Sequence, residues 1–459
     1  MLTITDSDVW IKELRRLESD VPPRDTLAVY QTIKEELCGM EVEDVFEWFD
    51  PEPLGSASIG QVHRARLRGG KEVAVKVQYN EVGSLFRYDM KAIRKFCEVL
   101  APENVISLNA LEQQNAMELD YCSEASNLKE VHRNMERHGF TPSEVRVPLP
   151  IDGLSTKRML VMELLSGPKL SDGVRAYFAK WAKENGTSLE ELEAKSRIKI
   201  EEEGIPARYN GPSANQIEWV KKYSSFRNKF VNSGVALYNT TVGKIRGVEK
   251  LPYRQNDVLL NLPQLVDVLM RVHGRQLLQD GCFNTDPHGG NFLLLPDGKI
   301  GLIDYGATKH LSRNERLSAC LIFAALHRND ENFLYELCVS GGYKSKHGRK
   351  DVLMKLMKFA YDTYGNDLMK GKNVQQFMDE LKAADPYEEA SDNLVMASFM
   401  SIRLRSLALG MNHPVRCSDW WGPMAEEILI NEGLPYESWD RDLLNKYRPE
   451  LNMQKYKFG

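Results

Sequence analysis

Three separated segments of the sequence contain residues that could bind a nucleoside triphosphate and a metal ion. Lys76 ends the run VAVK. Asp286 and Asn291 stand with four residues between them, and Asp304 begins the tripeptide DYG. Phosphoryl transfer from ATP needs a cation at the phosphates, oxygen ligands for magnesium and an acid beside the attacking group. The three segments have the order and spacing of the kinase motifs VAIK, HRDLxxxN and DFG.

Each of these residues has a separate expected role. We expect Lys76 to hold the α- and β-phosphates and Asp286 to orient an acceptor hydroxyl or water, which makes these two the candidate catalytic residues. We expect Asn291 and Asp304 to bind the metal, because carboxylate and amide oxygens suit magnesium. Taken singly, the lysine segment is a moderate signal that an exposed edge-strand lysine would also explain, and the two acidic segments are weak signals because turn acids are common. Together they favour a site whose cofactors are ATP (or ADP) and Mg²⁺.

The segment before the lysine strand departs from the glycine-rich loop of protein kinases. A GxGxxG is expected there, because backbone N–H groups must cover the phosphates. The sequence reads GSASIGQV, with Ala57 and Ser58 in place of the middle glycines. Their Cβ atoms narrow the permitted backbone angles. We therefore expect Ala57, Ser58, Gly60 and Val62 to line the nucleotide site, with an altered approach to the phosphates.

Two predicted hairpins place these residues. Residues 61–67 and 72–78 alternate around a Gly-Gly turn, which puts Lys76 on one face and the neighbouring valines on the other. Residues 293–303 predict a second hairpin, turned by PDG at 296–298, that folds Asn291 and Asp304 back toward one metal ion. A buried strand is expected at residues 157–165.

The remaining segments read mainly as helices. We expect helix through residues 1–50, two helices within 83–138, the second from about 109 to 137, and an all-helical tail over 311–459. Residues 172–250 look like the least regular part, and the charged run SLEELEAKSRIKIEEE predicts a solvated helix face in preference to a binding site.

These segments predict an α+β fold with two lobes of the protein-kinase kind. The smaller N-lobe contains the strands and extra helices, and the larger C-lobe is mostly helical. The expected parts are an N-terminal helical extension (1–50), the N-lobe with its alanine-containing loop (51–170), an insertion or linker (171–254) and the C-lobe with a helical tail (255–459).

Composition excludes several other classes of protein. Hydrophobic residues make up 42% and charged residues 27%, as in an ordinary globular chain, and the net charge of −5 argues against a nucleic-acid partner. Seven dispersed cysteines without a CxxC pair argue against a disulfide framework or zinc site and favour a reducing compartment. No apolar run reaches about 18 residues. The start MLTITDSDVW resembles neither a signal peptide nor an organelle presequence.

Five motifs together resemble one family. PLGSASIGQVHRA, VAVKVQ, ELDYCSEASN, TDPHGGN and LIDYG occur in the order of the UbiB-type atypical kinases, the ADCK group, and the likeness covers about residues 15–165 and 255–435. It implies a kinase-like bilobal fold, ATP and magnesium binding, and ATPase or small-molecule kinase activity in preference to protein phosphorylation. It also implies a role in prenylquinone or other isoprenoid-lipid metabolism, a mitochondrial or plastid location, and an isoprenoid lipid, a membrane surface or a biosynthetic protein as partner.

The resemblance also assigns acids that serve the lysine. Glu118 and Asp120 match the family's ExD element, and Glu124 follows in EASN, so either Glu118 or Glu124 is expected to pair with Lys76. On an ideal helix Glu118 and Asp120 lie about 200° apart. Asp120, Glu124 and Asn127 share one face. The two acids of ExD therefore cannot serve one partner on a regular helix.

The sequence departs from the family pattern in three places. The KxGQ element expected upstream of LESDVPP is absent, which predicts a truncated gene model or a different gate over the site. Asn284 replaces a histidine two residues before Asp286, and Gly289 replaces a proline; we expect both changes to loosen the loop. His288 is expected to be structural, because Asp286 is the better-placed base. The length of 172–250 exceeds what the family predicts.

Three functions remain open on these grounds. The preferred one is an active ATPase or small-molecule kinase. A nucleotide-gated pseudokinase that binds a lipid or a protein partner is the alternative, and an ordinary protein kinase is disfavoured because no APE motif follows Asp304. MASFMSIRLRSLAL, which contains Arg403 and Arg405, fits an interfacial membrane helix. A buried tail helix is the favoured interpretation.

Overall fold

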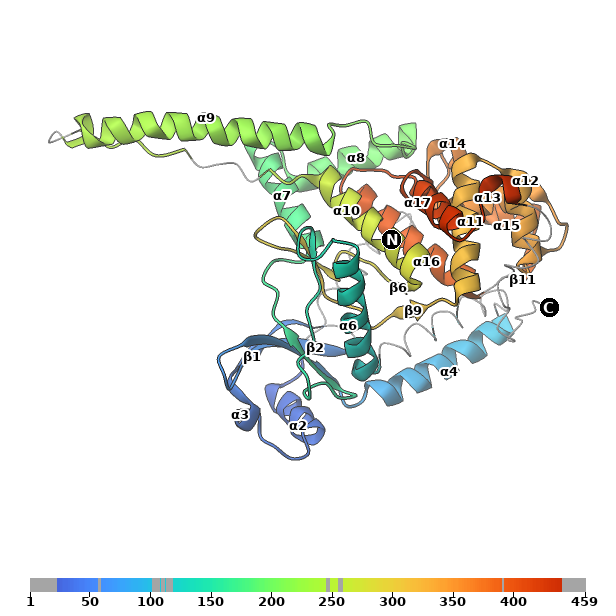
Figure 1. Cartoon of the computed structure of the whole chain (residues 1–459), viewed down its shortest axis with the longest axis horizontal. Helices are drawn as coiled ribbons and strands as arrows, with labels where there is room; N and C mark the ends of the chain where they lie inside the picture. Colours follow the sequence, from blue (N-terminus) through green and yellow to red (C-terminus); the bar gives the residue numbers. More distant parts are fainter. Residues whose placement is uncertain are drawn as a thin grey trace.

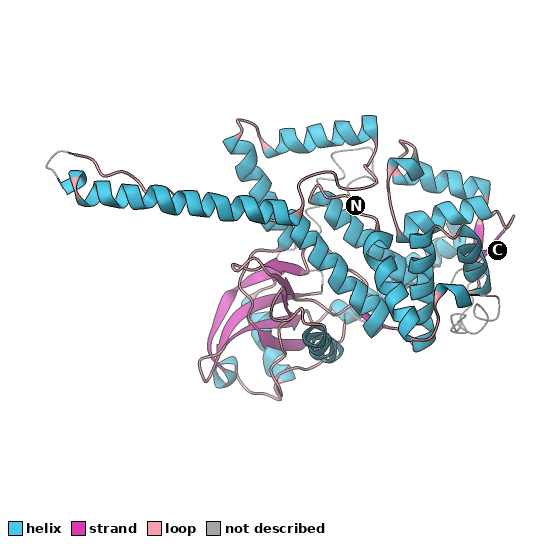
Figure 2. Cartoon of the chain, turned by 45° about the horizontal axis from the view of Figure 1, so that its top comes forward, coloured by secondary structure: helices cyan, strands magenta, loops and turns pink. Residues whose placement is uncertain are grey.

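The computed structural model describes residues 23–56, 59–100, 119–244, 248–254, 259–389 and 392–439, together with Leu108 and Glu112. A small lobe containing the largest sheet packs against a larger, mostly helical lobe, and a long helix projects away from both (Figures 1 and 2). The expected α+β, two-lobed class is thus confirmed. Among the described residues, no helix combines the length and the apolarity needed to cross a bilayer.

The small lobe is built on an antiparallel four-stranded sheet of order β1-β2-β3-β5. Its valines alternate in β3, so Val73, Val75 and Val77 enter one core while Lys76 faces the other lobe. The predicted hairpin and the strand near residue 160 are confirmed. The elements of this lobe are α2 (Thr26–Glu36), α3 (Val42–Val45), β1 (Phe46–Ser56), β2 (Gly60–Leu67), β3 (Glu72–Gln78), α4 (Val82–Leu100), α6 (Tyr121–Arg137) and β5 (Met159–Glu163).

Two helix predictions in this lobe are wrong. Helix was expected through residue 50, but β1 begins at Phe46, because Phe46 and Phe49 bury their rings in the core behind the sheet. A helix was expected from about residue 109 without interruption, but α6 begins at Tyr121. Asp120 is extended and caps that helix through the N–H of Cys122. Asp120 therefore does not share a helical face with Glu124.

The large lobe contains two small β-elements and a helical core. The β7–β8 hairpin is confirmed, with a left-handed glycine at 298 in its turn. Up to residue 439, the described part of the tail is mostly helical but contains the two-residue and three-residue strands β10 and β11, so the all-helical prediction is wrong there; residues 440–459 lie outside the described residues. The strands are β4 (Val145–Arg146), β6 (Cys282–Asn284), β7 (Phe292–Leu294), β8 (Ile300–Leu302), β9 (Thr308–His310), β10 (Lys344–Ser345) and β11 (Tyr387–Glu389).

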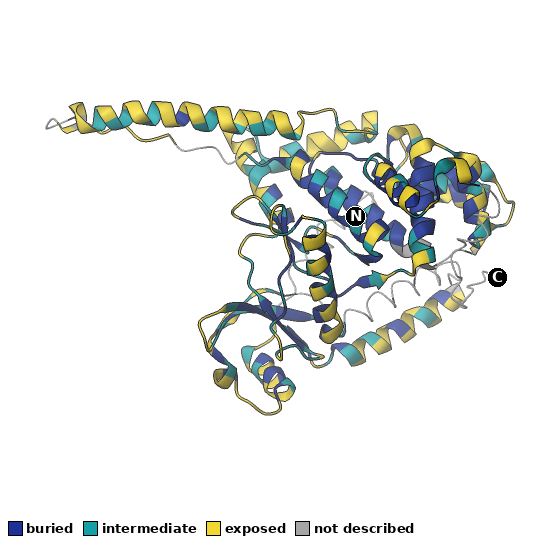
Figure 3. Ribbon diagram, in the orientation of Figure 1, coloured by how far each residue is buried: buried dark blue, intermediate teal, exposed yellow. Residues whose placement is uncertain are grey.

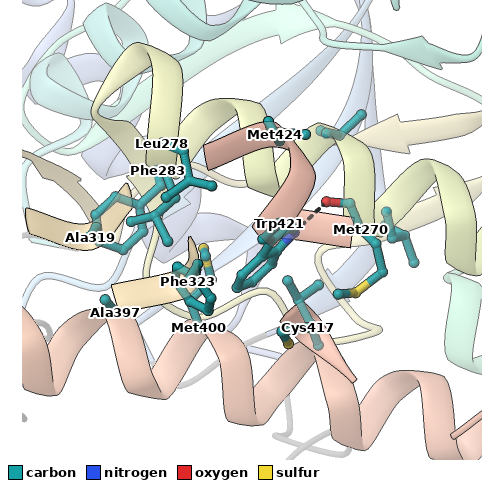
Figure 4. Packing of buried hydrophobic residues seen from close by; sticks show 14 of the residues in the cluster. Met270, Leu278, Phe283, Ala319, Phe323, Ala397, Met400, Cys417, Trp421 and Met424 are labelled. Carbon is teal, nitrogen blue, oxygen red and sulfur yellow. Dashed lines mark hydrogen bonds between the residues drawn. The ribbon is translucent and has the colours of Figure 1, made fainter. Parts of the chain in front are cut away.

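The helices of this lobe pack around Trp421. Its indole N–H donates to the carbonyl of Met270 at 2.8 Å, and its ring meets Phe323 edge-on (Figure 4). This packing fixes the helices that support the site. They are α10 (Leu262–Arg275), the π turn η3 (Gln276–Asp280), α11 (Arg313–Arg328), α12 (Glu331–Ser340), α13 (Lys350–Tyr361), α14 (Asn366–Met369), α15 (Val374–Ala384), α16 (Asp392–Gly410), α17 (Cys417–Asn431) and the short η4 (Tyr436–Ser438).

The segment between the lobes is helical, contrary to the expectation of irregular structure for 172–250. It forms α7 (Leu170–Glu184), α8 (Leu189–Glu203), α9 (Ala214–Thr240) and the short η2 (Val242–Lys244). Serine caps begin α8 and α9. The charged run is α8, which has no buried residue, so the prediction of a solvated helix face is confirmed.

Candidate active site

Lys76 is the centre of a charge cluster drawn from three distant segments. Its Nζ lies 2.9 and 2.8 Å from the two carboxylate oxygens of Glu124 on α6, and 3.2 Å from Oδ2 of Asp304. The Lys76 side chain is 14% exposed and that of Glu124 only 1%. The Tyr121 ring covers the ammonium, with Nζ 4.9 Å from the ring centroid. The structure therefore joins the small lobe, α6 and the large lobe at one ammonium.

The cluster shifts the pKa of each member. Burial disfavours the charged lysine, but the carboxylates of Asp304 and Glu124 outweigh burial and hold the pKa of Lys76 well above its usual value. Burial raises the pKa of Glu124 to about 7, against the opposing effect of Lys76. Burial also acts to raise the pKa of Asp304, yet the Lys76 ammonium brings the pKa of that carboxyl below its usual value. Asp304 is thus a carboxylate at neutral pH, as a magnesium ligand must be.

Asp286, Asn291 and Asp304 are brought together by backbone pairing. The amide of Asn291 donates through Nδ2 to the carbonyl of Asp286 at 3.1 Å, which leaves the side-chain oxygen of Asn291 without a donor among the described residues. The Ile303 N–H donates to the Asn291 carbonyl at 3.2 Å, next to Asp304. The Gly306 N–H donates to Oδ1 of Asp304 at 3.0 Å and fixes its carboxylate. His288 accepts from the Gly290 N–H through Nδ1 at 3.1 Å.

Asn284 connects the two acidic segments. Its side chain is 2% exposed, donates to the Asp304 carbonyl at 2.8 Å and accepts from the Asp286 N–H at 2.8 Å. The prediction that Asn284 loosens the loop is therefore wrong, because its amide supplies both a donor and an acceptor at this point. Gly289 is also closely packed: a Cβ there would lie 3.2 Å from both Leu407 and Ser171.

Arg403 of α16 reaches the candidate catalytic acid. Its Nε lies 3.0 Å from Oδ1 of Asp286. The N–H does not point at that oxygen, so Oδ1 is buried without a hydrogen bond from any described residue. A carboxylate oxygen in this state is charge-compensated and still able to accept a proton. Sequence reasoning gave Arg403 no place in the site. The available signal was an arginine among apolar residues of α16.

The rest of α16 is a core helix. Arg405 is 1% exposed and donates through Nη2 to the carbonyls of Phe359 and Ala360 at 2.7 and 2.9 Å. The favoured interpretation, a buried tail helix, is confirmed over the described side chains from residue 397 onward.

Helix α6, which carries Glu124, is attached to the large lobe along its length. The amide of Asn127 donates to the Tyr305 carbonyl at 3.0 Å. Glu130 lies 3.1 Å from His310, and at the end of the helix Arg137 and His138 lie 2.6 and 2.8 Å from the buried Asp280. These contacts fix Glu124 relative to Asp304.

Glu130 and His310 also lie beside Cys282, with their ligand atoms within 4.8 Å of one another. The hydrogen bond between His310 and Glu130 explains why these side chains lie together, without a metal ion. Burial, together with the Glu130 carboxylate, raises the pKa of the Cys282 thiol well above its usual value. The thiol therefore stays protonated.

Of the remaining residues predicted to line the nucleotide site, some lie in the described part of the structure and some do not. Gly60 begins β2, where a Cβ would lie 2.4 Å from the carbonyl of Val77, so the close backbone approach requires glycine. Val62 is the strand neighbour of Lys76. Ala57, Ser58 and Glu118 lie outside the described residues. Of the two glutamates considered, Glu124 makes the pair with Lys76.

The donor set fits a magnesium–nucleotide complex. Lys76 offers a cation for phosphate oxygens, and Asp304 and Asn291 offer hard oxygen ligands from adjacent positions of one hairpin. Asp286 offers an oxygen that accepts a proton. This arrangement can perform phosphoryl transfer to a hydroxyl group or to water.

Comparison with known proteins agrees with this arrangement. The model of the ABC1 atypical kinase-like domain matches residues 16–195 and 244–338, more than half of the chain. AarF domain-containing kinase 1 of Drosophila melanogaster is 35% identical over 169 residues, which cover 36% of this chain and 32% of that protein. An uncharacterized chloroplastic aarF domain-containing protein kinase of Arabidopsis thaliana is 24% identical over 457 residues, covering 97% of this chain and 67% of the relative.

The chain spans only about a third of the fly relative's length. Among solved structures, a Mycobacterium tuberculosis protein in complex with erythromycin matches with a TM-score of 0.42 and 18% identity, covering 90% of this chain and 88% of the other. The family match confirms the kinase-like character of the fold and the resemblance of the five motifs.

Proposed function

The chain belongs to the ABC1 atypical kinase-like family, and we propose that it is an ATP- and Mg²⁺-dependent phosphotransferase or ATPase. The observation that carries this proposal is the Lys76 ammonium shared between Glu124 and Asp304. Kinase chemistry requires that lysine–glutamate pair and an aspartate for the metal in one place. The relatives named as kinases support the same class of activity.

Each residue has one task in the proposed reaction. Asp304 and the side-chain oxygen of Asn291 would hold the metal, which would neutralise charge on the phosphates. Lys76 anchors the phosphates while Glu124 keeps the ammonium oriented. Oδ1 of Asp286 accepts the proton of the attacking hydroxyl or water as the phosphoryl group leaves the nucleotide.

Asp304→Asn tests the assignment. The variant keeps the size of the side chain and removes the negative charge that binds the metal, so magnesium-dependent ATP turnover by the purified chain is expected to be lost. Asp297→Asn is the matched control, because Asp297 lies in the turn of the same hairpin and contacts Lys299 at the surface. Full activity in Asp304→Asn, or equal loss in both variants, would refute the assignment.

The acceptor that we propose is a small molecule or water, with the activity placed in or regulating isoprenoid-lipid (prenylquinone) metabolism. The likeness of the motifs to UbiB-type kinases supports this part, and a biosynthetic protein is the proposed partner. A mitochondrial or plastid location goes with it; one relative is named as chloroplastic. Radiolabelled ATP incubated with prenylated phenols separates transfer to the lipid from hydrolysis.

A pseudokinase that binds nucleotide without transfer is the second candidate. It is favoured by Ala57 and Ser58, which stand where kinases have glycines over the phosphates. A single-turnover assay distinguishes the two functions. No hydrolysis of bound ATP, with or without lipid, supports the pseudokinase.

A further inference from the structure

Helix α9, the short η2 and the described residues 248–254 of the segment that returns from it form an arm. The arm projects from the body of the molecule in both orientations (Figures 1 and 2). The return segment is fastened to one face of the helix, because Asn232 exchanges two hydrogen bonds with the backbone of Arg254 and Asn239 exchanges two with that of Leu251, all of 2.7–2.9 Å. The arm is therefore a built element with one covered face.

Helix α9 is exposed over most of its length (Figure 3), and the face opposite the return segment carries large apolar side chains. Five large side chains, each more than half exposed, lie within an arc of about 60° when the helix is drawn at 100° per residue. Asn232 and Asn239 fall on the other side of the helix. We call this row the outer stripe: Trp219, Tyr223, Phe226, Phe230 and Leu237. An exposed stripe of this kind marks a contact surface.

Cations border the outer stripe. Lys222 and Lys229 lie along one edge of it and Arg227 along the other, and none of the three has an acidic partner among the described residues. Residues 214–254 contain eight lysines and arginines against two glutamates, in a chain whose net charge is −5. The arm is thus a basic element on an acidic protein.

We propose that the arm docks on a membrane surface that contains anionic lipid. A helix with aromatic side chains on one face and lysines beside them is the pattern of an interfacial helix. Each basic residue close to an anionic surface adds to the binding.

Two other binding partners fit the outer stripe less well: a coiled-coil helix of another protein and a second copy of the arm. The spacing of the outer stripe also suits a coiled coil, but coiled-coil seams use Leu, Ile and Val, and four of these five residues are aromatic. A second copy of the arm would place like charges beside each other. The family model does not match residues 196–243, so this surface belongs to the chain and not to the family pattern.

Vesicle flotation with the full chain tests the proposal, using vesicles of phosphatidylcholine alone and of phosphatidylcholine mixed with phosphatidylglycerol. We expect binding to the mixed vesicles that falls as salt is raised. The double variant Lys222→Gln/Lys229→Gln should weaken it about 25-fold, at about fivefold for each cation. Phe226→Ser/Phe230→Ser should weaken it at least as much, because each ring loses its apolar contact.

Matched controls separate the arm from other exposed apolar residues and from the chemistry of the active site. Leu27→Ser/Ile430→Ser removes two side chains of similar exposure elsewhere and should leave binding unchanged. Asp304→Asn should also bind the mixed vesicles normally. The test of membrane docking is therefore independent of whether the proposed phosphotransfer is correct. Equal binding to neutral vesicles, full binding by the phenylalanine variant, or lipid-free self-association that the phenylalanine variant abolishes would each overturn the proposal.

Discussion

Replacing Lys76 by methionine tests the central charge cluster. Methionine keeps an unbranched chain of similar length and removes the ammonium, so the carboxylate of Glu124 stays buried with no cation at 2.8 Å. Breaking a buried pair by removing one partner typically costs about 3–5 kcal/mol. ATP turnover should be lost as well, because the phosphates lose their anchor.

The size of the stability loss depends on pH, and its sign follows from Glu124. Burial raises the pKa of Glu124 from 4.5 to about 7 even with Lys76 present. At about 1.4 kcal/mol per unit, ionising Glu124 already costs the folded state about 3 kcal/mol. Without Lys76 the pKa of Glu124 rises further. Below pH 7 Glu124 is protonated in both folded proteins, so the stability difference between the variant and wild type does not change with pH there. Above pH 7 the wild-type carboxyl ionises and that of the variant does not, so the difference widens by up to about 1.4 kcal/mol per pH unit.

Urea unfolding of wild type, Lys76→Met and Lys76→Met/Glu124→Gln at pH 5 and pH 8 measures the effect. Between pH 5 and pH 8 the stability deficit of the single variant should grow by about 1.4 kcal/mol, because pH 8 lies one unit above the wild-type pKa of Glu124. The double variant should recover most of this loss, because a neutral amide replaces the stranded charge. Both variants should remain inactive. A single variant as stable as wild type at pH 8, or no recovery in the double variant, would refute the reasoning.

Three further predictions concern neighbouring residues. Because the pKa of Glu124 is raised to about 7, its carboxylate becomes protonated as the pH falls through 7. The value of kcat/KM for ATP should therefore drop tenfold per pH unit below 7, and Glu124→Gln should remove this dependence from the pH profile. Asn284→Ala removes two buried hydrogen bonds, so it should lower the free energy of unfolding by about 2 kcal/mol and weaken the binding of fluorescent ATP analogues. Asn185→Ala, at the exposed end of α7, is the control and should change neither quantity. Arg403→Met should lower kcat about fivefold with little change in KM for ATP, because the half-exposed guanidinium contacts Asp286 and not the phosphates; a larger change in KM than in kcat would contradict this.

The sequence predicts the elements whose patterns are local. Alternation of valines around Lys76 is enough to give the β2–β3 hairpin, and the PDG turn is enough to give β7–β8. The four residues proposed for metal and nucleotide binding were chosen from motif order, because each motif lies beside a turn or strand that can be recognised independently.

The features that the sequence does not predict are contacts between residues that lie far apart along the chain. Arg403 meets Asp286 across 117 positions, and nothing local in α16 specifies that contact. The role of Asn284 was misjudged because its effect comes from two partners on different segments. Helix α9 was missed although its aromatic residues stand at helical spacing. Helical periodicity is usually interpreted as a face that packs on a core, and the aromatic residues of α9 face outward instead.

The attachment of α6 to the large lobe has a consequence for control of the enzyme. Conventional protein kinases are silenced when the corresponding helix swings outward and carries its glutamate away from the lysine. Here that swing would have to break the contacts of Asn127, Glu130, and the Arg137–His138 pair in a single movement. The position of Glu124 is therefore set by the large lobe as well as by its ion pair with Lys76, so an outward position of α6 is disfavoured in this chain.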